Sequence, residues 1–223
     1  MQTAFLFDLD GTLVDSVYQH VMAWTEALVS EGIDLSIWRV HRKIGMSGGL
    51  LTNMLLRETA GMNLDPARIE RIQRQHAKAY VKHAKDIKPL PGARELLAAL
   101  TEASIPWAIA TSGRMETARP VLETLGIDFE RVALVTRDEV EHAKPDPDLF
   151  VAAANKLGVG VEHAFVVGDA VWDMLAARRA RCLGVGLLSG GYGQEELERA
   201  GAYRVYEDPA DLLLHLDEVG GRR

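Results

Sequence analysis

Short apolar runs recur along the chain and predict the strands of a sheet. Each run is four or five residues long and shows no clean alternation of apolar and polar positions; the runs are residues 4–7, 107–110, 132–135, 164–167 and 184–188. Strands that are buried on both faces have this pattern. We therefore expect these runs to form the inside of a sheet that is covered on both of its faces.

Helical patterns lie between the later runs. Residues 93–103 place three leucines on one face, a second helix ends at Gly126, and the segment 146–158 reads as a helix with an aspartate cap at its start. Asp208 followed by Pro209 opens a last helix, since a capping residue before a proline is typical of a helix start. Strands that alternate with helices predict an α/β fold with a Rossmann-like, mostly parallel sheet and helices on both faces.

Residues 16–88 break this alternation and read as an insert that is all helical. The first part is amphipathic, with apolar residues at helical spacing: Val17, Val21, Trp24 and Leu28. Asp65 before Pro66 caps a second long helix, and no strand pattern lies between the two. We expect a small helical cap domain of residues 16–88, inserted after the first strand into an α/β core of residues 1–15 and 89–223.

Composition narrows the class of protein. The chain has 223 residues, of which 48% are hydrophobic and 26% charged, as is ordinary for a soluble globular protein. Its net charge of −7 argues against a general nucleic-acid binder, and no apolar stretch approaches the roughly 20 residues that cross a bilayer. Cys182 is the single cysteine, and no secretory signal pattern is present. We therefore expect a cytoplasmic protein that binds neither nucleic acid nor membrane.

Polar side chains follow four of the apolar runs, close to the point where each run ends. In chain order they are Asp8 and Asp10; Thr111, Ser112 and Gly113; Lys144, across a loop; and Asp169 and Asp173. Ligands of an open parallel sheet bind beyond the carboxyl ends of its strands. We therefore expect these groups to converge at one edge of the sheet.

These groups share a chemistry. Carboxylates around one point hold a hard cation such as Mg²⁺ through oxygen ligands, and a hydroxyl beside backbone N–H groups at a helix start suits phosphate oxygens. A carboxylate can act as a nucleophile and form an acyl phosphate. A second carboxyl group two residues on can protonate the leaving oxygen and later activate water. The convergence therefore predicts a site for phosphoryl transfer, which depends mostly on positioning and charge stabilisation.

Four segments, "DLDGT", "ATSG", "KPDP" and "GDAVWD", resemble the motifs of the haloacid dehalogenase superfamily in their usual order. The resemblance covers nearly the whole chain, and the helical insert is similar to the small cap of that family. It implies a set of roles: Asp8 as nucleophile, Asp10 as general acid and base, Thr111 and Lys144 as ligands of the transferring phosphoryl group, and Ser112 and Gly113 as further substrate-binding residues.

The resemblance also implies a magnesium site. Mg²⁺ would be held by Asp8, by the backbone carbonyl of Asp10 and by Asp169, with Asp173 bound directly or through water. Taken alone, Asp173 could simply favour the start of a helix through the helix dipole. The cation would lie where the two aspartates of "DLD" otherwise repel each other.

Within the superfamily the chain is similar to phosphoglycolate phosphatases and related small phosphatases. Asp10 argues against haloacid chemistry, because the dehalogenases lack this second aspartate. His20 and Trp24 fall where β-phosphoglucomutases carry a histidine and a tryptophan. However, the mutases have an acidic residue where this chain has Gly168, and a cap arginine where this chain has Gly48.

Two residues of the insert are candidates for contact with the substrate. His20 lies among apolar positions of the first cap helix, so a packed or capping histidine is the competing interpretation. Lys43 lies beside "GMSGG", where the cap loop of this family meets the substrate. The basic residues between 68 and 88 are typical of a solvated helix face, and a field that attracts anionic substrates is the alternative.

The sequence therefore predicts a Mg²⁺-dependent phosphatase that hydrolyses a small phosphorylated metabolite through an aspartyl phosphate at Asp8. A sugar-phosphate mutase is one alternative, and a catalytically idle binding module with the same fold is another. A fold names no substrate. The sequence leaves the metabolite and the oligomeric state open.

Overall fold

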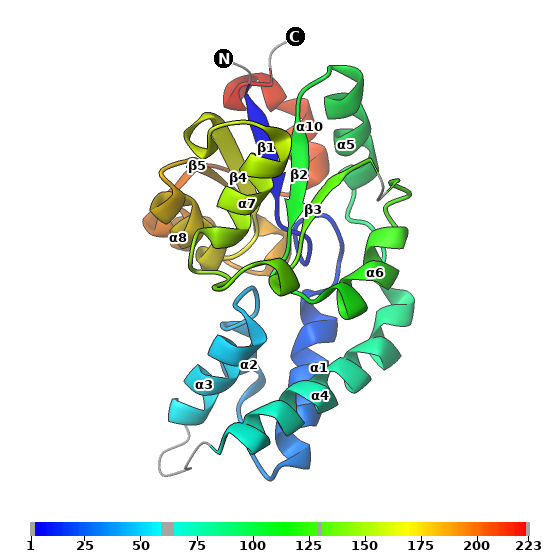
Figure 1. Cartoon of the computed structure of the whole chain (residues 1–223), viewed down its shortest axis with the longest axis vertical. Helices are drawn as coiled ribbons and strands as arrows, with labels where there is room; N and C mark the ends of the chain where they lie inside the picture. Colours follow the sequence, from blue (N-terminus) through cyan, green and yellow to red (C-terminus); the bar gives the residue numbers. More distant parts are fainter. Residues whose placement is uncertain (1–2, 59–64, 129–130, 222–223) are drawn as a thin grey trace.

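Six parallel strands form one sheet at the centre of the structure, a computed structural model that describes residues 3–58, 65–128 and 131–221. The strands are β1 (Ala4–Phe7), β2 (Trp107–Ala110), β3 (Ala133–Val135), β4 (Ala164–Gly168), β5 (Leu183–Leu187) and β6 (Ala202–Tyr206). Their order across the sheet is β3-β2-β1-β4-β5-β6 (Figure 1). The chain builds the sheet outward from β1 in both directions, and such a switch point is where open sheets bind ligands.

The five apolar runs are confirmed as strands, and β6 is a sixth that the apolar pattern does not predict. Tyr203 and Arg204 in its centre are exposed, because β6 lies at the edge of the sheet. The continuous apolar pattern belongs to strands that are buried on both faces. A half-exposed edge strand therefore escapes a search for apolar runs.

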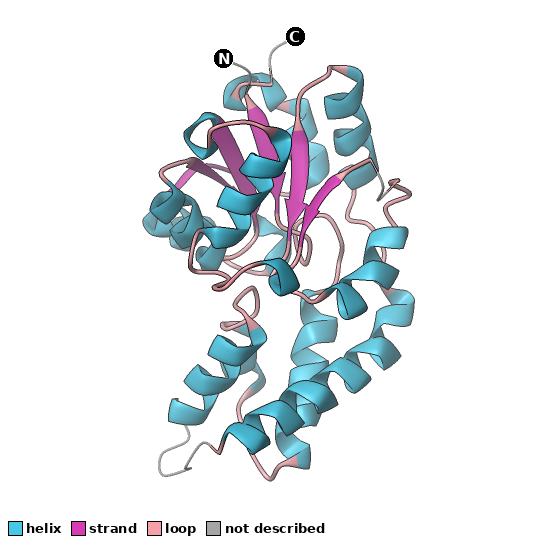
Figure 2. Ribbon diagram, viewed as in Figure 1, coloured by secondary structure: helices cyan, strands magenta, loops and turns pink. Residues whose placement is uncertain are grey.

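Helices cover both faces of the sheet (Figure 2). The helices of this part are α5 (Ala93–Glu102), α6 (Met115–Glu123), α7 (Asp148–Leu157), α8 (Val171–Ala180), α9 (Gln194–Ala200) and α10 (Pro209–Leu214), with the short 3₁₀ helices η2 (Arg137–Glu139), η3 (Val161–His163), η4 (Leu188–Gly190) and η5 (Leu216–Val219). Side chains of α5, α6 and α10 pack with Phe5 and Phe7 on one face. Those of α7 and α8 pack with Ala4 and Leu6 on the other, which confirms the predicted Rossmann-like α/β fold.

Two of the three predicted aspartate caps are confirmed. The carboxylates of Asp208 and Asp65 accept hydrogen bonds from backbone N–H groups in the first turns of their helices. The prediction for α7 is wrong, because this helix follows Pro147 and has no side-chain cap. The Asp146 carboxylate instead accepts a hydrogen bond from Arg179 at 2.7 Å, so a tertiary contact replaces the local one.

The insert forms a helical part below the sheet in Figure 1. Its elements are α1 (Val17–Ser30), α2 (Ile37–His41), α3 (Gly48–Glu58), α4 (Pro66–His83) and η1 (Ala84–Asp86). These helices bury an apolar cluster of their own, which includes Val21, Trp24 and Ile72. Within residues 16–58 and 65–88 the structure has no strand, which agrees with the sequence pattern.

Two segments connect the helical cap to the sheet, and they run side by side. The Asp15 N–H donates to the Lys88 carbonyl, and the Leu90 N–H donates to the Leu13 carbonyl, both at 2.9 Å. The predicted domain boundaries fall within these two segments, and they stay a prediction.

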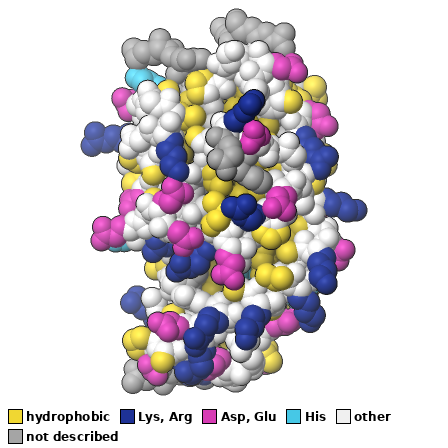
Figure 3. All heavy atoms as spheres, turned by 45° about the vertical axis from the view of Figure 1, so that its right-hand side comes forward, with side chains coloured by type: hydrophobic (Ala, Val, Ile, Leu, Met, Phe, Trp, Pro, Cys, Tyr) yellow, Lys and Arg dark blue, Asp and Glu magenta, His cyan; other side chains and the backbone are white. Residues whose placement is uncertain are grey.

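Charged side chains of both signs are interspersed over the face of the molecule that Figure 3 shows. The basic residues of α4 take part in this pattern, since Arg68 and Arg71 pair with Glu31, and Lys82 pairs with Glu26. These contacts fit the interpretation of a solvated helix face. None of the described helices combines the length and the apolar character of a membrane span.

Candidate active site

The polar groups that follow the strands meet at one edge of the sheet. Asp8 follows β1, and its backbone N–H donates to the Val167 carbonyl of β4 at 2.8 Å. Thr111 follows β2, and its backbone N–H donates to the Val135 carbonyl of β3 at 3.0 Å. Ladder hydrogen bonds therefore extend to both residues, so their side chains leave the sheet from fixed backbone positions.

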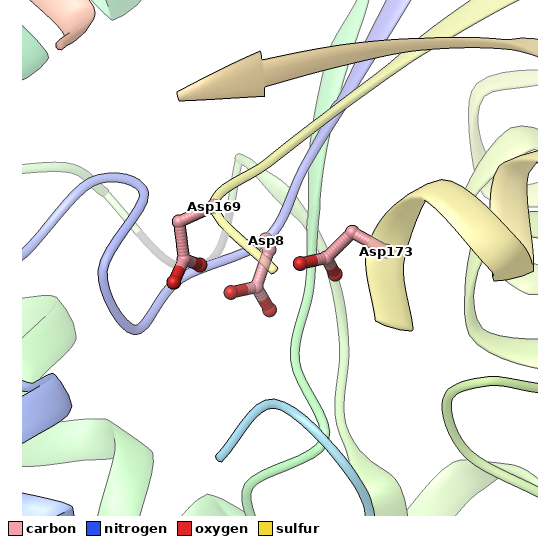
Figure 4. Close-up of side chains that lie close together, drawn as sticks. All are labelled: Asp8, Asp169 and Asp173. Atoms are coloured by element: carbon pink, nitrogen blue, oxygen red, sulfur yellow. The ribbon is translucent and has the colours of Figure 1, made fainter. Parts of the chain in front are cut away.

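Three carboxylates gather beside β1 and β4 (Figure 4). Oxygens of Asp8, Asp169 and Asp173 lie within 4.8 Å of one another, and all three residues are buried. Lys144 is buried too; its ammonium group pairs with Asp8 and lies 2.8 Å from Oδ1 of Asp173. Gly168 leaves room for the Asp173 side chain in this cluster, because a Cβ at position 168 would collide with it.

Negative charge is in excess in this cluster. Burial raises the pKa of Asp8 to about 7; the pairing with Lys144 opposes this shift, while the charges of Asp173 and Asp10 add to it. Burial and the neighbouring carboxylates hold the pKa of Asp169 well above its usual range. Burial also opposes the charge of Lys144, but the adjacent carboxylates outweigh it and raise the pKa of that ammonium group.

A divalent cation fits this cluster. Carboxylate oxygens are the ligands that Mg²⁺ takes in proteins, and added positive charge would offset the repulsion between the buried acids. Asp169 is oriented for such a role, since the Thr12 hydroxyl donates to its Oδ1 at 3.1 Å. A Cβ at Gly11 or at Gly190 would collide with its Oδ2, so small residues keep the space around this oxygen.

Asp10 has a different environment, although it lies only two residues after Asp8. Its Oδ1 accepts a hydrogen bond from Ser16 Oγ at 2.6 Å, and it lies 3.2 Å from His20 Nε2 and 3.5 Å from the Tyr80 hydroxyl. Burial raises the pKa of Asp10, but His20 and the hydrogen bond of Ser16 outweigh it, so the pKa lies below its usual value. Asp10 therefore rests as a carboxylate that residues of the helical cap hold in place.

The turn after β2 brings hydroxyl and N–H groups to the same edge. The buried Thr111 hydroxyl oxygen accepts a hydrogen bond from the Gly113 N–H at 2.9 Å. The Ser112 hydroxyl donates to the carbonyl of Gly45 in the cap at 3.0 Å. The first hydroxyl keeps its hydrogen for another acceptor, and the second links the core to the cap.

A cavity of about 400 Å³ lies between the α/β part and the helical cap. Asp8 and Asp10 line it from the core, together with Ser112 and Gly113. From the cap it is lined by side chains of α1 and α4 and by the segment 44–51. Asp8, Asp10, Ser112 and Gly113 therefore share one cavity, whereas the other predicted groups of the core do not line it: Thr111, Lys144, Asp169 and Asp173.

The two cap candidates differ in position. His20 lines the cavity, and its Nδ1 lies 3.2 Å from Nε2 of His76. It is packed as well, since its ring stacks on Tyr80 with ring centroids 3.9 Å apart. The structure does not bring Lys43 to the cavity, because its ammonium group pairs with Glu58 at 3.0 Å.

Sequence reasoning missed five polar side chains of the cavity. Two of them, Gln73 and His76, lie on α4, and the other three come from the core: Arg114, Thr117 and Arg137. The spacing along α4 could have identified His76, because it lies four residues after Ile72 and four before Tyr80, and both of these residues are buried.

Comparisons with known proteins agree with this geometry. A model of the haloacid dehalogenase-like hydrolase family matches residues 2–181. Hexitol phosphatase A of Escherichia coli is 34% identical over 180 residues, which are 80% of this chain and 79% of that protein. A phosphoglycolate phosphatase of Rhodospirillum rubrum is 32% identical over 232 aligned residues, which cover 100% of this chain and 95% of that protein.

Solved structures are similar over the whole chain. A hydrolase from Pseudomonas syringae is 58% identical, with a TM-score of 0.95 over 98% of this chain and 99% of that one. A β-phosphoglucomutase from Clostridium difficile has a TM-score of 0.85 over 99% of this chain and 97% of that one. At 24% identity, the second similarity shows the fold alone.

Proposed function

The chain belongs to the haloacid dehalogenase-like hydrolases, and we propose that it hydrolyses a small phosphomonoester through a phosphoaspartyl intermediate at Asp8. The observation that carries this proposal is that two carboxyl groups with different surroundings line one cavity. Asp8 lies beside Lys144 in the buried cluster, and Asp10 is held apart from that cluster by cap residues.

In the first step, Asp8 attacks phosphorus and the bond from phosphorus to the ester oxygen breaks. Lys144 and the hydroxyl of Thr111 compensate the charge on the phosphoryl oxygens. The departing oxygen takes a proton from Asp10. Asp10 rests ionised, so it must take up a proton from the solvent before it can serve as the acid; His20 Nε2 lies 3.2 Å from its Oδ1.

In the second step, water attacks phosphorus and the acyl phosphate bond breaks, which releases inorganic phosphate and restores the carboxylate of Asp8. Asp10 now accepts the proton of the attacking water, in the ionised form that its surroundings favour. One residue therefore serves as acid and then as base, and release of the proton taken from water to the solvent returns Asp10 to its resting carboxylate.

Mg²⁺ is the cofactor that we propose for this site. Asp8, Asp169 and the backbone carbonyl of Asp10 would hold it, with Asp173 as a direct or water-mediated ligand. When bound, it supplies positive charge that screens the nucleophile from the phosphoryl oxygens it approaches. The excess of buried carboxylates over cations supports this assignment.

The names of the relatives support a small phosphorylated metabolite as substrate. The net charge of −7 disfavours nucleic acid as a partner. Cys182 is buried and unpaired, as suits the reducing interior of a cell, so we propose a cytoplasmic location.

Hydrolysis is favoured over a mutase reaction by the cap side of the cavity. A mutase must bind one phosphate group of its substrate through cap residues while the other phosphoryl group is transferred. Here Gly48 and Gly49 line the cavity at the place where a cap arginine would serve that purpose. We therefore expect β-glucose 1-phosphate to yield free phosphate rather than glucose 6-phosphate, even with a bisphosphate primer.

Purified protein assayed on a panel of phosphomonoesters, with and without Mg²⁺, tests the proposal. We expect phosphate release that requires the cation and is lost in Asp8→Asn. No release from any ester, including p-nitrophenyl phosphate, would favour a binding module that uses the same fold without catalysis.

A further inference from the structure

The names of two relatives point to phosphate esters of alcohols that differ in charge: one is a hexitol phosphatase and the other a phosphoglycolate phosphatase. Resting on the phosphatase function proposed above, we infer that the alcohol released by this enzyme is uncharged and rich in hydroxyl groups, as in a polyol or sugar monophosphate. The inference comes from the side chains that the cap presents to the cavity.

The released alcohol must face the cap. The phosphoryl group is fixed on the core side by its bond to Asp8, so the rest of the substrate extends toward the opposite wall. In the described part of the chain, the cap residues that line the cavity include no Lys, Arg, Asp or Glu. A substrate therefore meets a surface without Lys, Arg, Asp or Glu side chains beyond its phosphoryl group.

That wall is polar, although it carries none of these four residue types. Ser47, Gln73, His20 and His76 line it. Burial, together with the neighbouring His20, holds the pKa of His76 well below its usual value, so its ring is neutral near pH 7. Neutral groups of this kind both donate and accept hydrogen bonds. They match hydroxyl groups, which also do both.

The arginines of the core wall are already engaged. Arg114 pairs with Asp138 at 2.5 Å. Arg137 donates to the carbonyls of Val140 and Glu141, at 2.5 and 3.1 Å. These contacts occupy one nitrogen of Arg114 and two of Arg137, and both arginines lie on the core wall, away from the cap surface that the released alcohol faces.

Burying an unpaired carboxylate is strongly unfavourable. The positive end of α3, which begins at Gly48, is the remaining attraction for an anion. Its N–H groups serve hydroxyl oxygens equally well, so it does not select a carboxylate. The cavity volume of about 400 Å³ suits a metabolite of the size of a sugar phosphate.

Steady-state kinetics on matched esters tests the inference. The panel holds a hexitol 6-phosphate, glucose 6-phosphate, phosphoglycolate and, as a reference, p-nitrophenyl phosphate. We expect kcat/KM for at least one of the two neutral alcohol esters to exceed that for phosphoglycolate by about tenfold or more, which is roughly 1.4 kcal/mol. Equal or faster hydrolysis of phosphoglycolate would overturn the inference while leaving the phosphatase function intact. Failure on all four, including the nitrophenyl ester, would instead remove the phosphatase function and this inference with it.

A charge added to the cap wall provides a second test. Gln73→Lys places an ammonium group at the cavity, and Gln75→Lys is the matched control, because Gln75 lies on the same helix but is exposed. We expect Gln73→Lys to raise kcat/KM for phosphoglycolate relative to the hexitol phosphate by about tenfold, and Gln75→Lys to leave the ratio unchanged. An unchanged ratio in Gln73→Lys, or an equal rise in the control, would show that this wall does not select for charge.

Discussion

Asp8 and Asp10 are separated by one residue, yet their pKa values are shifted in opposite directions. Asp8 belongs to a buried group of acids, whereas Asp10 accepts a hydrogen bond from Ser16 and faces His20. Environments that separate two carboxyl groups in this way allow them to take different roles. A cation beside Asp8 would favour the ionised form that attacks phosphorus.

At Asp10, the role in proton transfer can be separated from the role in structure. Asp10→Asn keeps the backbone carbonyl but loses the proton shuttle, so the rate on an alkyl phosphate should fall by about 10²–10⁴. The loss should be smaller for p-nitrophenyl phosphate, whose leaving group needs no proton. The measurement is the ratio of variant to wild-type kcat/KM on each ester, because kcat/KM reports the steps up to release of the leaving group; equal losses would argue against Asp10 as the general acid.

At Asp8, the raised pKa predicts an effect on stability. Burial raises the pKa of the folded state to about 7 from 3.8, so the ionised carboxylate weakens the fold as the pH rises through this interval. In the absence of metal, Asp8→Asn should therefore raise the melting temperature near pH 8 by at least about 2–4 °C, the shift that 1 kcal/mol produces at this chain length.

The same substitution should bring a much smaller gain near pH 4, where Asp8 is protonated in the folded state and only partly ionised in the unfolded state. Melting curves of wild type and variant at the two pH values decide the matter. A gain that is the same at both pH values would mean that the buried charge is not its cause.

Residues at the ends of the apolar runs could be predicted, because strand ends of a parallel sheet meet at one edge. The contacts of Asp10 could not. Its hydrogen bond from Tyr80 joins residues 70 positions apart, and it depends on how α1 packs against α4. The pairing of Lys43 with Glu58 likewise depends on the start and end of α3.

At the scale of elements, η4 after β5 shapes the acidic cluster without contributing a charge. A Cβ at Gly190 would collide with Oδ2 of Asp169. Gly190→Ala should therefore displace this carboxylate, weaken Mg²⁺ binding and lower kcat. Gly126→Ala is the control: a Cβ there meets no atom within 4 Å, although the residue has a φ of +69°.

We expect the control to lose stability by an amount on the order of 1 kcal/mol through backbone strain, while its Mg²⁺ affinity stays that of the wild type. Titration of activity with Mg²⁺, alongside melting curves, separates the two effects. If Gly190→Ala binds Mg²⁺ as tightly as Gly126→Ala does, the steric account of Asp169 is wrong.

Elements with a repeating pattern were predictable, and elements set by tertiary contacts were not. The inner strands follow from their apolar runs, whereas β6 is half-exposed at the edge. The cap expected for α7 fails because Asp146 bonds Arg179 instead. In α4, the basic residues are evident from the sequence. Which face of this helix lines the cavity depends on the packing of the whole cap, so the sequence alone does not predict it.

At the scale of the whole molecule, the cap and the core meet through polar contacts around the cavity. Ser112 bonds the Gly45 carbonyl at 3.0 Å, and His41 Nε2 lies 2.9 Å from the Gly190 carbonyl. Partly exposed polar contacts contribute little stability each. Such contacts are weak enough to break and form again, as closure of the cap over a substrate would require.

Binding of Mg²⁺ should stabilise the whole fold, because the site is formed by segments that are far apart in the unfolded chain. At a hundredfold excess over Kd, a ligand specific for the folded state contributes about 2.7 kcal/mol. We expect a matching rise in melting temperature, inactivity in EDTA, and a smaller response in Asp169→Asn. Full turnover in excess chelator with no retained metal would contradict the proposed metal site.

Chemical trapping of the intermediate tests the central claim most directly. Borohydride reduces an acyl phosphate to an alcohol, so an aspartyl phosphate at Asp8 would become homoserine at position 8. Asp10→Asn with p-nitrophenyl phosphate is the suitable sample, because formation of the intermediate needs no acid while its hydrolysis lacks the base. Peptide mass spectrometry should find homoserine at position 8 only when substrate and Mg²⁺ are both present. Continued turnover with no homoserine there, or with homoserine at another aspartate, would contradict the account.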